Sequence, residues 1–243
     1  MHHRIHVARA IALAATAAAA SACTIDDETV ADVEHVEHVE NVSAHADALS
    51  ADADASGAEP AWSSTCYIFQ RGLLGDVEDA TIYLESPYYN EGATPSIHVG
   101  TASLTKLGLL RFDLDSFTED TMVVWAGLGL AQQWSTHDTE ILLHRALAPW
   151  FEDTVTWSSF AEAYESGSLA SFATTGNGFS SHEVNVSGIV SAWVAGALPN
   201  YGFVIAQPGG SNHAFRSSDH PNQGFRPYLR VCVARGQLEA GGY

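Results

Sequence analysis

The chain has 243 residues, with 29 acidic against 10 basic side chains and a formal net charge of −19 at pH 7. This balance disfavours nucleic acid as a partner, because nucleic-acid binding depends on neutralising phosphates with Lys and Arg. Docking on an anionic lipid surface is disfavoured for the same electrostatic reason.

Residues 1–22 have the pattern of a secretory signal peptide. Arg4 and Arg9 give a basic start, an apolar stretch follows over residues 10–20, and Ala20-Ser21-Ala22 is a small-residue cleavage site. The apolar stretch is too short and too rich in alanine for a good transmembrane helix. We therefore expect export, with cleavage before Cys23.

Cys23 itself predicts a lipid anchor. The sequence around it resembles a bacterial lipoprotein box, except that Ala20 stands where leucine is usual, and ordinary and lipoprotein peptidases would cut the same bond. Cys66 and Cys232 bracket the folded region and are expected to form a disulfide in an oxidising compartment, which leaves Cys23 unpaired. Lipidation of Cys23 accounts for this odd cysteine, and a stray free thiol is the alternative. We expect a lipoprotein of the bacterial outer membrane or cell surface that reaches the membrane only through its lipid; a periplasmic or secreted protein is the alternative.

Residues 23–60 are predicted to be an acidic, disordered tether. Residues 24–60 carry eleven acids, no Lys or Arg and no aromatic side chain, so they cannot bury enough apolar area to offset the entropy of ordering. His35 and His38 could chelate a metal weakly, but a solvated tether that holds the next domain away from the membrane is the favoured interpretation.

Residues 61–243 have the length of one domain, and they carry 18 acids and 8 bases. Short runs alternate apolar and polar residues and are separated by turn-rich segments, which is typical of half-buried antiparallel strands. The expected core-facing sets are Leu110, Phe112 and Leu114; Val124, Ala126, Leu128 and Leu130; Tyr201, Phe203 and Ile205; and Leu229, Val231 and Val233. Gly202 and Val204 alternate with the third set and are expected to face away from the core.

One segment has helical spacing instead. Ile189, Val190 and Trp193 predict a short helix over about residues 187–196, ending at Gly196. The fold expected is therefore all-β, an antiparallel jelly-roll β-sandwich with one short helix. Cys66 lies in the first expected strand and Cys232 in the last, so their bond would stabilise the fold by about 4–5 kcal/mol in the chain-entropy treatment.

Five segments in order resemble a known family. They are EDATIYLESPYYNEGATPSIHVG, with Asp79, Ala80, Thr81, Asn90, Gly92, Val99 and Gly100; LLRFDL, with Arg111 and Asp113; LHRALAPWFEDTVTW, with His144, Arg145, Trp150, Thr156 and Trp157; VNVSGIVSAWVAGALPNYGFVI, with Trp193 and Tyr201; and FRSSDHPNQGFRPYLRVCV, with Arg226. Together, from about Asp79 to Val233, they resemble the DNRLRE domain, which is also grouped with the family 96 carbohydrate-binding modules.

The resemblance implies a jelly-roll module of exported and surface proteins, some of whose relatives bind acidic polysaccharide such as alginate. The sequence departs from the family pattern at two places, so the ligand of this chain follows less directly from the family. Phe151 separates Trp150 from Glu152, and the strand after LLRFDL reads WAGLGLAQQW rather than alternating Leu and Arg.

An enzyme is the least favoured function. The sequence has no G-x-S-x-G, H-E-x-x-H or C-x-x-C motif and no Gly-rich phosphate loop. His144 and Glu152 could act as base and acid, but nothing supplies a nucleophile or a polysaccharide lyase's full set of groups. We therefore predict no catalytic residue.

Carbohydrate binding is the favoured function, because sugars are held by flat aromatic rings and polar groups. The candidate rings are Tyr88 and Tyr89 in a loop, Trp125 opposite the core-facing set of its strand, and Trp134 in a polar segment. The alternative is that such rings are core residues. For an acidic ligand, Lys106 and Arg216 are the candidate bases, since Arg111 and Arg226 are expected to bond Asp113 or carbonyl groups. A structural or adhesive surface module without a specific sugar shares all of these features.

A structural calcium ion is a further candidate. Asp76, Asp79 and Asn90, with Glu78 and Glu91, supply the hard oxygen atoms that Ca²⁺ prefers. Their spacing fits no defined loop, and Asp79 and Asn90 could cap turns instead.

The segment LLHRALAPWFEDTVTW, residues 142–157, is dense in functional side chains but is predicted to be architectural. It reads as a strand that Pro149 ends, followed by a corner at Trp150. Trp150 and Trp157 are expected to fill one end of the sandwich, while Glu152 and Asp153 accept N–H groups or pair with Arg145.

Overall fold

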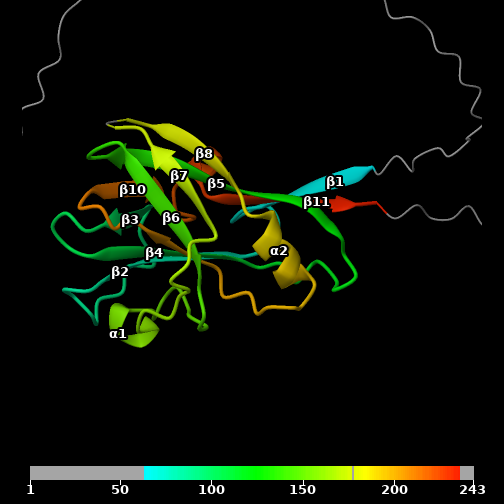
Figure 1. Cartoon of the computed structure of the whole chain (residues 1–243), viewed down its shortest axis with the longest axis horizontal. Coiled ribbons are helices and arrows are strands. Elements are labelled where there is room, and N and C mark those ends of the chain that lie inside the picture. Colours follow the sequence, from blue (N-terminus) through cyan, green and yellow to red (C-terminus); the bar gives the residue numbers. More distant parts are fainter. Residues whose placement is uncertain (1–62, 177, 236–243) are drawn as a thin grey trace, which may run out of the picture. The chain divides into compact units, whose positions relative to one another are not determined.

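The computed structural model describes residues 63–176 and 178–235 (Figure 1). The predicted signal peptide, the acidic tether and the lipidation residue Cys23 lie outside the described residues. Of the helices in the described ranges, none combines the length and the apolar character needed to cross a membrane.

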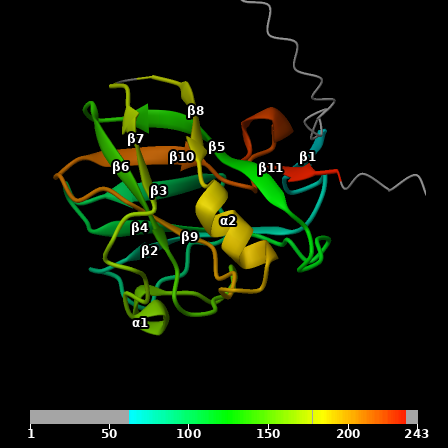
Figure 2. The same cartoon turned by 45° about the vertical axis from the view of Figure 1, so that its right-hand side comes forward.

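The described residues form an all-β fold with eleven strands in one hydrogen-bonded sheet, in the order β1-β11-β5-β10-β3-β4-β9-β6-β7, with β2 added on β4 and β8 on β5. The strands are β1 (Ser64–Phe69), β2 (Val77–Tyr83), β3 (Ser96–Gly100), β4 (Lys106–Phe112), β5 (Val123–Ser135), β6 (Thr139–Arg145), β7 (Ala170–Thr174), β8 (Ser180–Asn185), β9 (Phe203–Ala206), β10 (Asn212–Arg216) and β11 (Tyr228–Ala234). All of these strand pairs are antiparallel, and the sheet curls over a single large core (Figures 1 and 2). The predicted antiparallel sandwich is confirmed.

The predicted alternation holds in most strands. Leu110, Phe112 and Leu114 are buried in the main core. The predicted set on β11, Leu229, Val231 and Val233, is buried there too. Val124 was predicted to face the core, but this is wrong, because the residue is 47% exposed. It lies at the start of β5, close to an irregularity in the pairing with β11, where the strand leaves the covered part of the sandwich.

The predicted helix is confirmed as α2 (Ser187–Val194), whose Ile189, Val190, Trp193 and Val194 join the main core. Figure 2 shows α2 beside β5. Two further helical pieces were not predicted: the single turn α1 (Trp157–Phe160) and the 3-10 turn η1 (Gln223–Phe225). Such short turns bury too few residues to leave a periodic pattern in the sequence.

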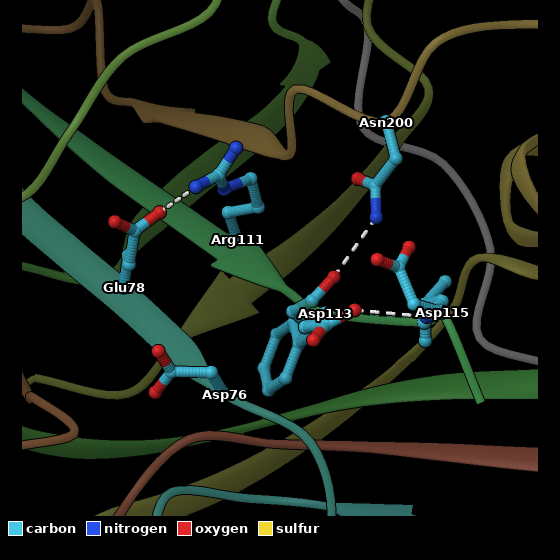
Figure 3. A pocket seen from close by; sticks show the side chains of 8 residues that line it. Asp76, Glu78, Arg111, Asp113, Asp115 and Asn200 are labelled. Carbon is cyan, nitrogen blue, oxygen red and sulfur yellow. Dashed lines mark hydrogen bonds and ion pairs between the residues drawn. The ribbon is translucent and has the colours of Figure 1, made fainter.

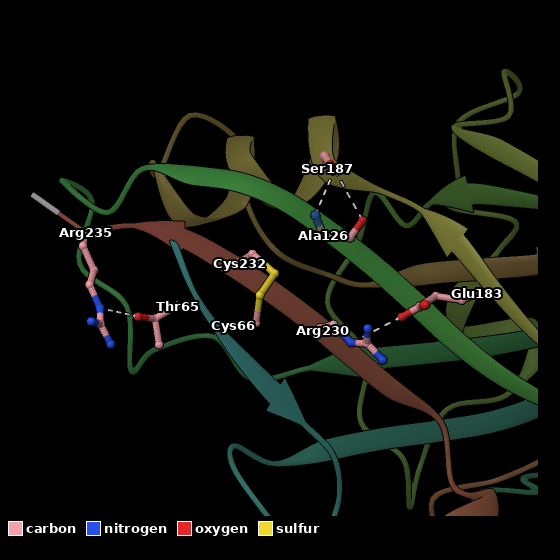
Figure 4. Close-up of a disulfide and its surroundings, with 8 residues drawn as sticks. All are labelled: Thr65, Cys66, Ala126, Glu183, Ser187, Arg230, Cys232 and Arg235. Carbon is pink, nitrogen blue, oxygen red and sulfur yellow. Dashed lines mark hydrogen bonds and ion pairs between the residues drawn. A yellow bond between two sulfur atoms is a disulfide. The ribbon is translucent and has the colours of Figure 1, made fainter. Parts of the chain in front are cut away.

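The predicted disulfide joins Cys66 to Cys232, across a separation of 166 residues. The two cysteines face each other in the antiparallel pairing of β1 with β11 (Figure 4). The first and last strands of the fold are therefore neighbours, as the sequence indicated.

Candidate functional site

The segment between β6 and β7 is a structural cover rather than a site. Trp150, Val155, Trp157 and Phe160 are buried in a second apolar cluster together with residues of β2, β4 and β9. The indole Nε1 of Trp150 donates to the carbonyl oxygen of Tyr201 at 2.8 Å. This cover explains why Val204, predicted to alternate away from the core, is fully buried: β9 is enclosed on both faces.

The charged side chains of the same segment also serve the fold. Glu152 accepts the N–H of Asp79 at 3.1 Å, which is one of the two roles expected of it, but the other, a pairing with Arg145, is wrong. Arg145 pairs with Glu165, with Nη2 and Oε1 2.6 Å apart, and not with Glu152 or Asp153. Glu152 instead receives two bonds from the guanidinium of Arg71, at 2.6 and 2.7 Å. The fold explains both pairings, because it brings Arg71 close to Glu152 and Glu165 close to Arg145, although neither pair is adjacent in the sequence.

His144 is buried and its ring is held in place. Its Nδ1 lies 2.9 Å from the carbonyl oxygen of Glu165, and its ring meets that of Tyr164 edge to face. In the part of the chain that the structure describes, no group placed to act as a nucleophile contacts His144. The predicted structural role of His144 therefore has a physical basis in these contacts.

Arg111 and Arg226 are held by different partners. Arg111 pairs with Glu78, directly opposite on β2, and lies over the ring of Trp150. The expected pairing of Arg111 with Asp113 is therefore wrong, because Asp113 lies beyond the end of β4. Arg226 donates to the carbonyl oxygens of His220 and Arg71, in agreement with the expectation.

A cavity of about 290 Å³ lies at the ends of β2 and β4 and is rich in carboxylates (Figure 3). Its lining includes Asp76, Glu78, Arg111, Asp113, Asp115 and Asn200. The acids are largely engaged within the fold: Asp76 accepts the N–H of Val77 at 2.9 Å and Asp113 that of Asp115 at 2.8 Å. The cavity is an acidic recess that suits neither an acidic sugar nor an aromatic stacking mode.

The three residues proposed as calcium ligands do not form one set. Asp76 lines the acidic recess, whereas Asp79 is buried and accepts the N–H of Ser218 at 2.7 Å. The amide nitrogen of Asn90 donates to the carbonyl oxygens of Glu152 and Val155. Within residues 63–176 and 178–235, no three His, Cys, Asp or Glu side chains are grouped to hold a metal ion. Calcium binding stays a prediction, which a melting curve with and without a chelator tests.

A different surface collects three of the six candidate binding residues, Lys106, Trp134 and Arg216. On the outer side of the sheet, Ala214 of β10 pairs with His98 of β3 on one side and with Trp134 of β5 on the other. The rings of His98 and Trp134 are 6.2 Å apart and meet edge to face, so the small Ala214 forms the floor between them. Both rings are partly exposed.

Strand pairing places a cation at each end of this surface. Arg216 pairs with Ser96 at one end of β10 and β3. At the other end, Gly100 pairs both with Asn212 and with Lys106, whose Nζ is 3.4 Å from the Asn212 side-chain oxygen. Because directly opposed residues share a face, Arg216 lies on the same side as His98 and Trp134, and so does Asn212, two residues from Ala214. Lys106 joins them through its contact with Asn212. We call this surface, made of His98, Lys106, Trp134, Asn212 and Arg216, the Trp134 face.

The loop after β2 lies near the Trp134 face, since the charge of Glu91 acts on the pKa of His98. The hydroxyl of Tyr83 donates to the carboxylate of Glu91, and the ring of Tyr83 lies 5.9 Å from that of Tyr89. Tyr89 is 53% exposed and Tyr88 is 84% exposed, so neither is a core residue. Burial lowers the pKa of His98 below its ordinary value, with Lys106 adding to the effect and Glu91 opposing it, so His98 is neutral at pH 7.

Four of the eight bases of the described residues pair with a carboxylate, and the two cations of this face are among the four that do not. Arg71, Arg111, Arg145 and Arg230 each pair with a carboxylate, whereas Lys106 and Arg216 form no ion pair with any described residue. The Nε of Arg216 is buried and has no hydrogen-bond partner in the same part of the chain. The two cations without an acidic partner among the described residues favour an anionic ligand here, since guanidinium and ammonium groups form strong bonds with carboxylates.

Trp125, the sixth candidate, lies elsewhere on β5, opposite Cys232. Its predicted outward orientation is confirmed by its position over Gly127 on the outer side of the strand. His98 and Asn212 were not among the residues predicted for a site. His98 alternates with the buried Ile97 and Val99, a signal that marked it as outward-facing but not as a neighbour of Trp134.

Comparison with known proteins supports the resemblance seen in the sequence. No curated protein is similar enough to this chain to count as a match. The sequence pattern of carbohydrate-binding module family 96 matches residues 74–232, which is more than half of the chain and nearly all of the described strands. The chain therefore belongs to carbohydrate-binding module family 96.

Proposed function

We propose that this chain is an exported, lipid-anchored module of the cell envelope or cell surface that binds an acidic polysaccharide on the Trp134 face. One observation carries the choice of ligand. Lys106 and Arg216, which have no acidic partner among the described residues, stand at the two ends of a surface with exposed rings at its centre. The domain carries 18 acids against 8 bases, and two of those bases stand together on this one surface.

Each part of the face matches one feature of an acidic sugar chain. The partly exposed rings of Trp134 and Tyr89 can stack against the apolar side of a sugar ring. Lys106 and Arg216 can bond carboxylates, and Asn212 and His98 can bond hydroxyl groups. Ser96 and Gly100, which mark the two ends, are four positions apart along β3, about 13 Å at 3.3 Å per residue, so the face accommodates a short stretch of polymer.

Affinity electrophoresis tests the proposal. The protein is run through native gels that contain alginate, pectin or no polysaccharide, and a glycan array extends the search to chitin oligosaccharides and host-type glycans. We expect retardation by an acidic polysaccharide that weakens as salt is added, because both cations are partly exposed to solvent and salt screens such charges. Tyr89→Ala should reduce the retardation while leaving the melting temperature unchanged.

A structural or adhesive surface module is the competing function. It predicts no retardation by any polysaccharide, and that result would overturn the proposal of sugar binding. Retardation by neutral polysaccharides only would leave carbohydrate binding in place but remove the acidic ligand from the Trp134 face.

Export and anchoring have their own test. The basic start, apolar stretch and small-residue cleavage site before Cys23 support the proposal. The intact mass of protein from the membrane fraction should show cleavage before Cys23 and an added diacylglycerol group. A mass without added lipid would reject the anchor while leaving the binding proposal intact.

A further inference from the structure

Two aromatic rings lie flat on the outer side of β5, far from the Trp134 face. A Cβ built on Gly127 would come within 2.2 Å of the ring of Trp125, and a Cβ on Gly129 within 2.1 Å of the ring of Tyr228. Each ring therefore occupies the space that a side chain would take at those positions. In the sequence Gly127-Leu128-Gly129-Leu130 the two leucines fill the core, while the two glycines leave the outer surface of β5 flat.

Polar groups border these rings. Arg230 of β11 and Glu183 of β8 reach each other across β5, with Nε and Oε1 3.5 Å apart (Figure 4). The guanidinium of Arg230 also lies over the ring of Tyr228, 5.8 Å from its centroid. Burial and the charge of Glu183 raise the pKa of Tyr228, so its hydroxyl keeps its proton at neutral pH.

The flat outer surface of β5 is held in place from two sides. Cys232, directly opposite Trp125, is bonded to Cys66 of β1, so the disulfide ties the edge strand to the strand beside the ring. On the following residue of β5, the N–H of Ala126 donates to the Ser187 hydroxyl of α2 at 2.8 Å. A binding surface that is already rigid loses less entropy when a ligand arrives.

We propose that this surface, made of Trp125, Tyr228, Arg230 and Glu183 and called here the Trp125 face, is a second carbohydrate site that binds neutral pyranose rings. The partly exposed ring of Trp125 supplies the stacking plane. Arg230 supplies N–H donors and Glu183 acceptor oxygens for adjacent hydroxyl groups.

Charge argues for a neutral ligand rather than an acidic one. Arg230 and Glu183 neutralise each other, so the pair offers no net charge to a carboxylate. The Trp134 face has the opposite arrangement, with two cations that lack acidic partners in the described ranges. Trp125 and Trp134 are nine residues apart on the same strand, about 30 Å at 3.3 Å per residue, so one ligand ring cannot span both.

The experiment uses the full chain in native gels that contain galactomannan, xyloglucan or mixed-linkage β-glucan. We expect retardation by at least one of these neutral polysaccharides, and at least a tenfold weaker affinity for it in Trp125→Ala. Retardation by alginate should be the same in Trp125→Ala and the wild-type protein. Trp134→Ala should show the reverse pattern, which separates a failure of this site from a failure of the Trp134 face.

A second variant guards against a Trp125→Ala protein that folds poorly. Gly127→Ala places a methyl group where the indole lies, so it should lift the ring and weaken neutral-sugar binding without removing any aromatic side chain. Gly167→Ala is the matched control, since a Cβ there meets nothing within 4 Å. No retardation by any of the three polysaccharides overturns the proposal, and so does retardation that Trp125→Ala and Gly127→Ala leave unchanged.

Discussion

The corner segment over residues 146–165 and the Trp134 face are opposites in sequence and in structure. The corner segment is rich in Trp, Glu and Asp, yet Trp150 and Trp157 are buried and Glu152 is bonded to Arg71. The Trp134 face is assembled from β3, β4, β5 and β10, each of which contributes one or two outward side chains. The residues that are close in sequence in the corner segment serve to pack the fold. The Trp134 face, whose cations have no acidic partner among the described residues, forms only when distant strands pair.

The largest expected effect concerns the corner segment. Trp150→Ala removes a buried indole and its bond to the Tyr201 carbonyl, and should lower the free energy of unfolding by about 3–5 kcal/mol. Trp157→Ala should behave similarly. Urea unfolding measures both. A near-neutral stability change with lost glycan binding would reverse the roles assigned to the two regions.

Asp79 links the corner segment to the sheet, since its N–H donates to Glu152 at 3.1 Å. Burial raises the pKa of Asp79 to about 7, above its unfolded value near 4. The folded state therefore binds the extra proton, and the stability that this gives is present at low pH and is lost as pH rises from about 4 to about 7.

Asp79→Asn should remove this pH dependence and be more stable than the wild-type protein at pH 8, by on the order of 2 kcal/mol. The asparagine keeps an oxygen for the N–H of Ser218. Urea unfolding at pH 5 and pH 8 checks the difference. A wild-type free energy of unfolding that does not fall over this range contradicts the expectation.

Lys106→Gln and Arg216→Gln test the charges of the Trp134 face. Each should weaken binding to alginate about tenfold, which corresponds to about 1.4 kcal/mol, with little change in stability. Arg235→Gln is the matched control, because it removes the same charge from an exposed residue bonded to Thr65. An equal loss in Arg235→Gln would show that only the overall charge matters.

The smallest expected effect comes from His98, whose pKa lies below its ordinary value. As pH falls through that pKa, His98 gains a positive charge beside Trp134, so an anionic glycan should bind more tightly. We expect about a threefold gain between pH 7.5 and pH 5. His98→Gln should abolish the gain; a variant that keeps it would assign the pH dependence to another group.

Strand patterns were predictable because burial imposes a period of two on each strand. The sets on β4 and β11, the helix α2 and the Cys66–Cys232 bond all follow from local periodicity or from cysteine count. Val124 and Val204 were misplaced for a common reason. Whether a strand face is covered depends on distant segments, such as the corner segment that lies over β9.

The Trp134 face was predictable only in part. Trp134, Lys106, Arg216 and Tyr89 could be chosen by residue type and by their polar neighbours in sequence. Their gathering depends on the pairing of β10 between β3 and β5, which alternation alone does not specify. The same limit explains the wrong partners of Arg111 and Arg145, because an ion pair depends on the register between strands.

The central claim is that the Trp134 face binds sugar while the corner segment only supports it. Calorimetric titration of an alginate oligosaccharide into wild-type protein and into Trp134→Ala tests this claim most directly, with melting curves recorded on the same samples. The account predicts at least a tenfold loss of affinity in Trp134→Ala with an unchanged melting temperature. An unchanged affinity, or a loss that occurs only together with a lower melting temperature, would contradict it.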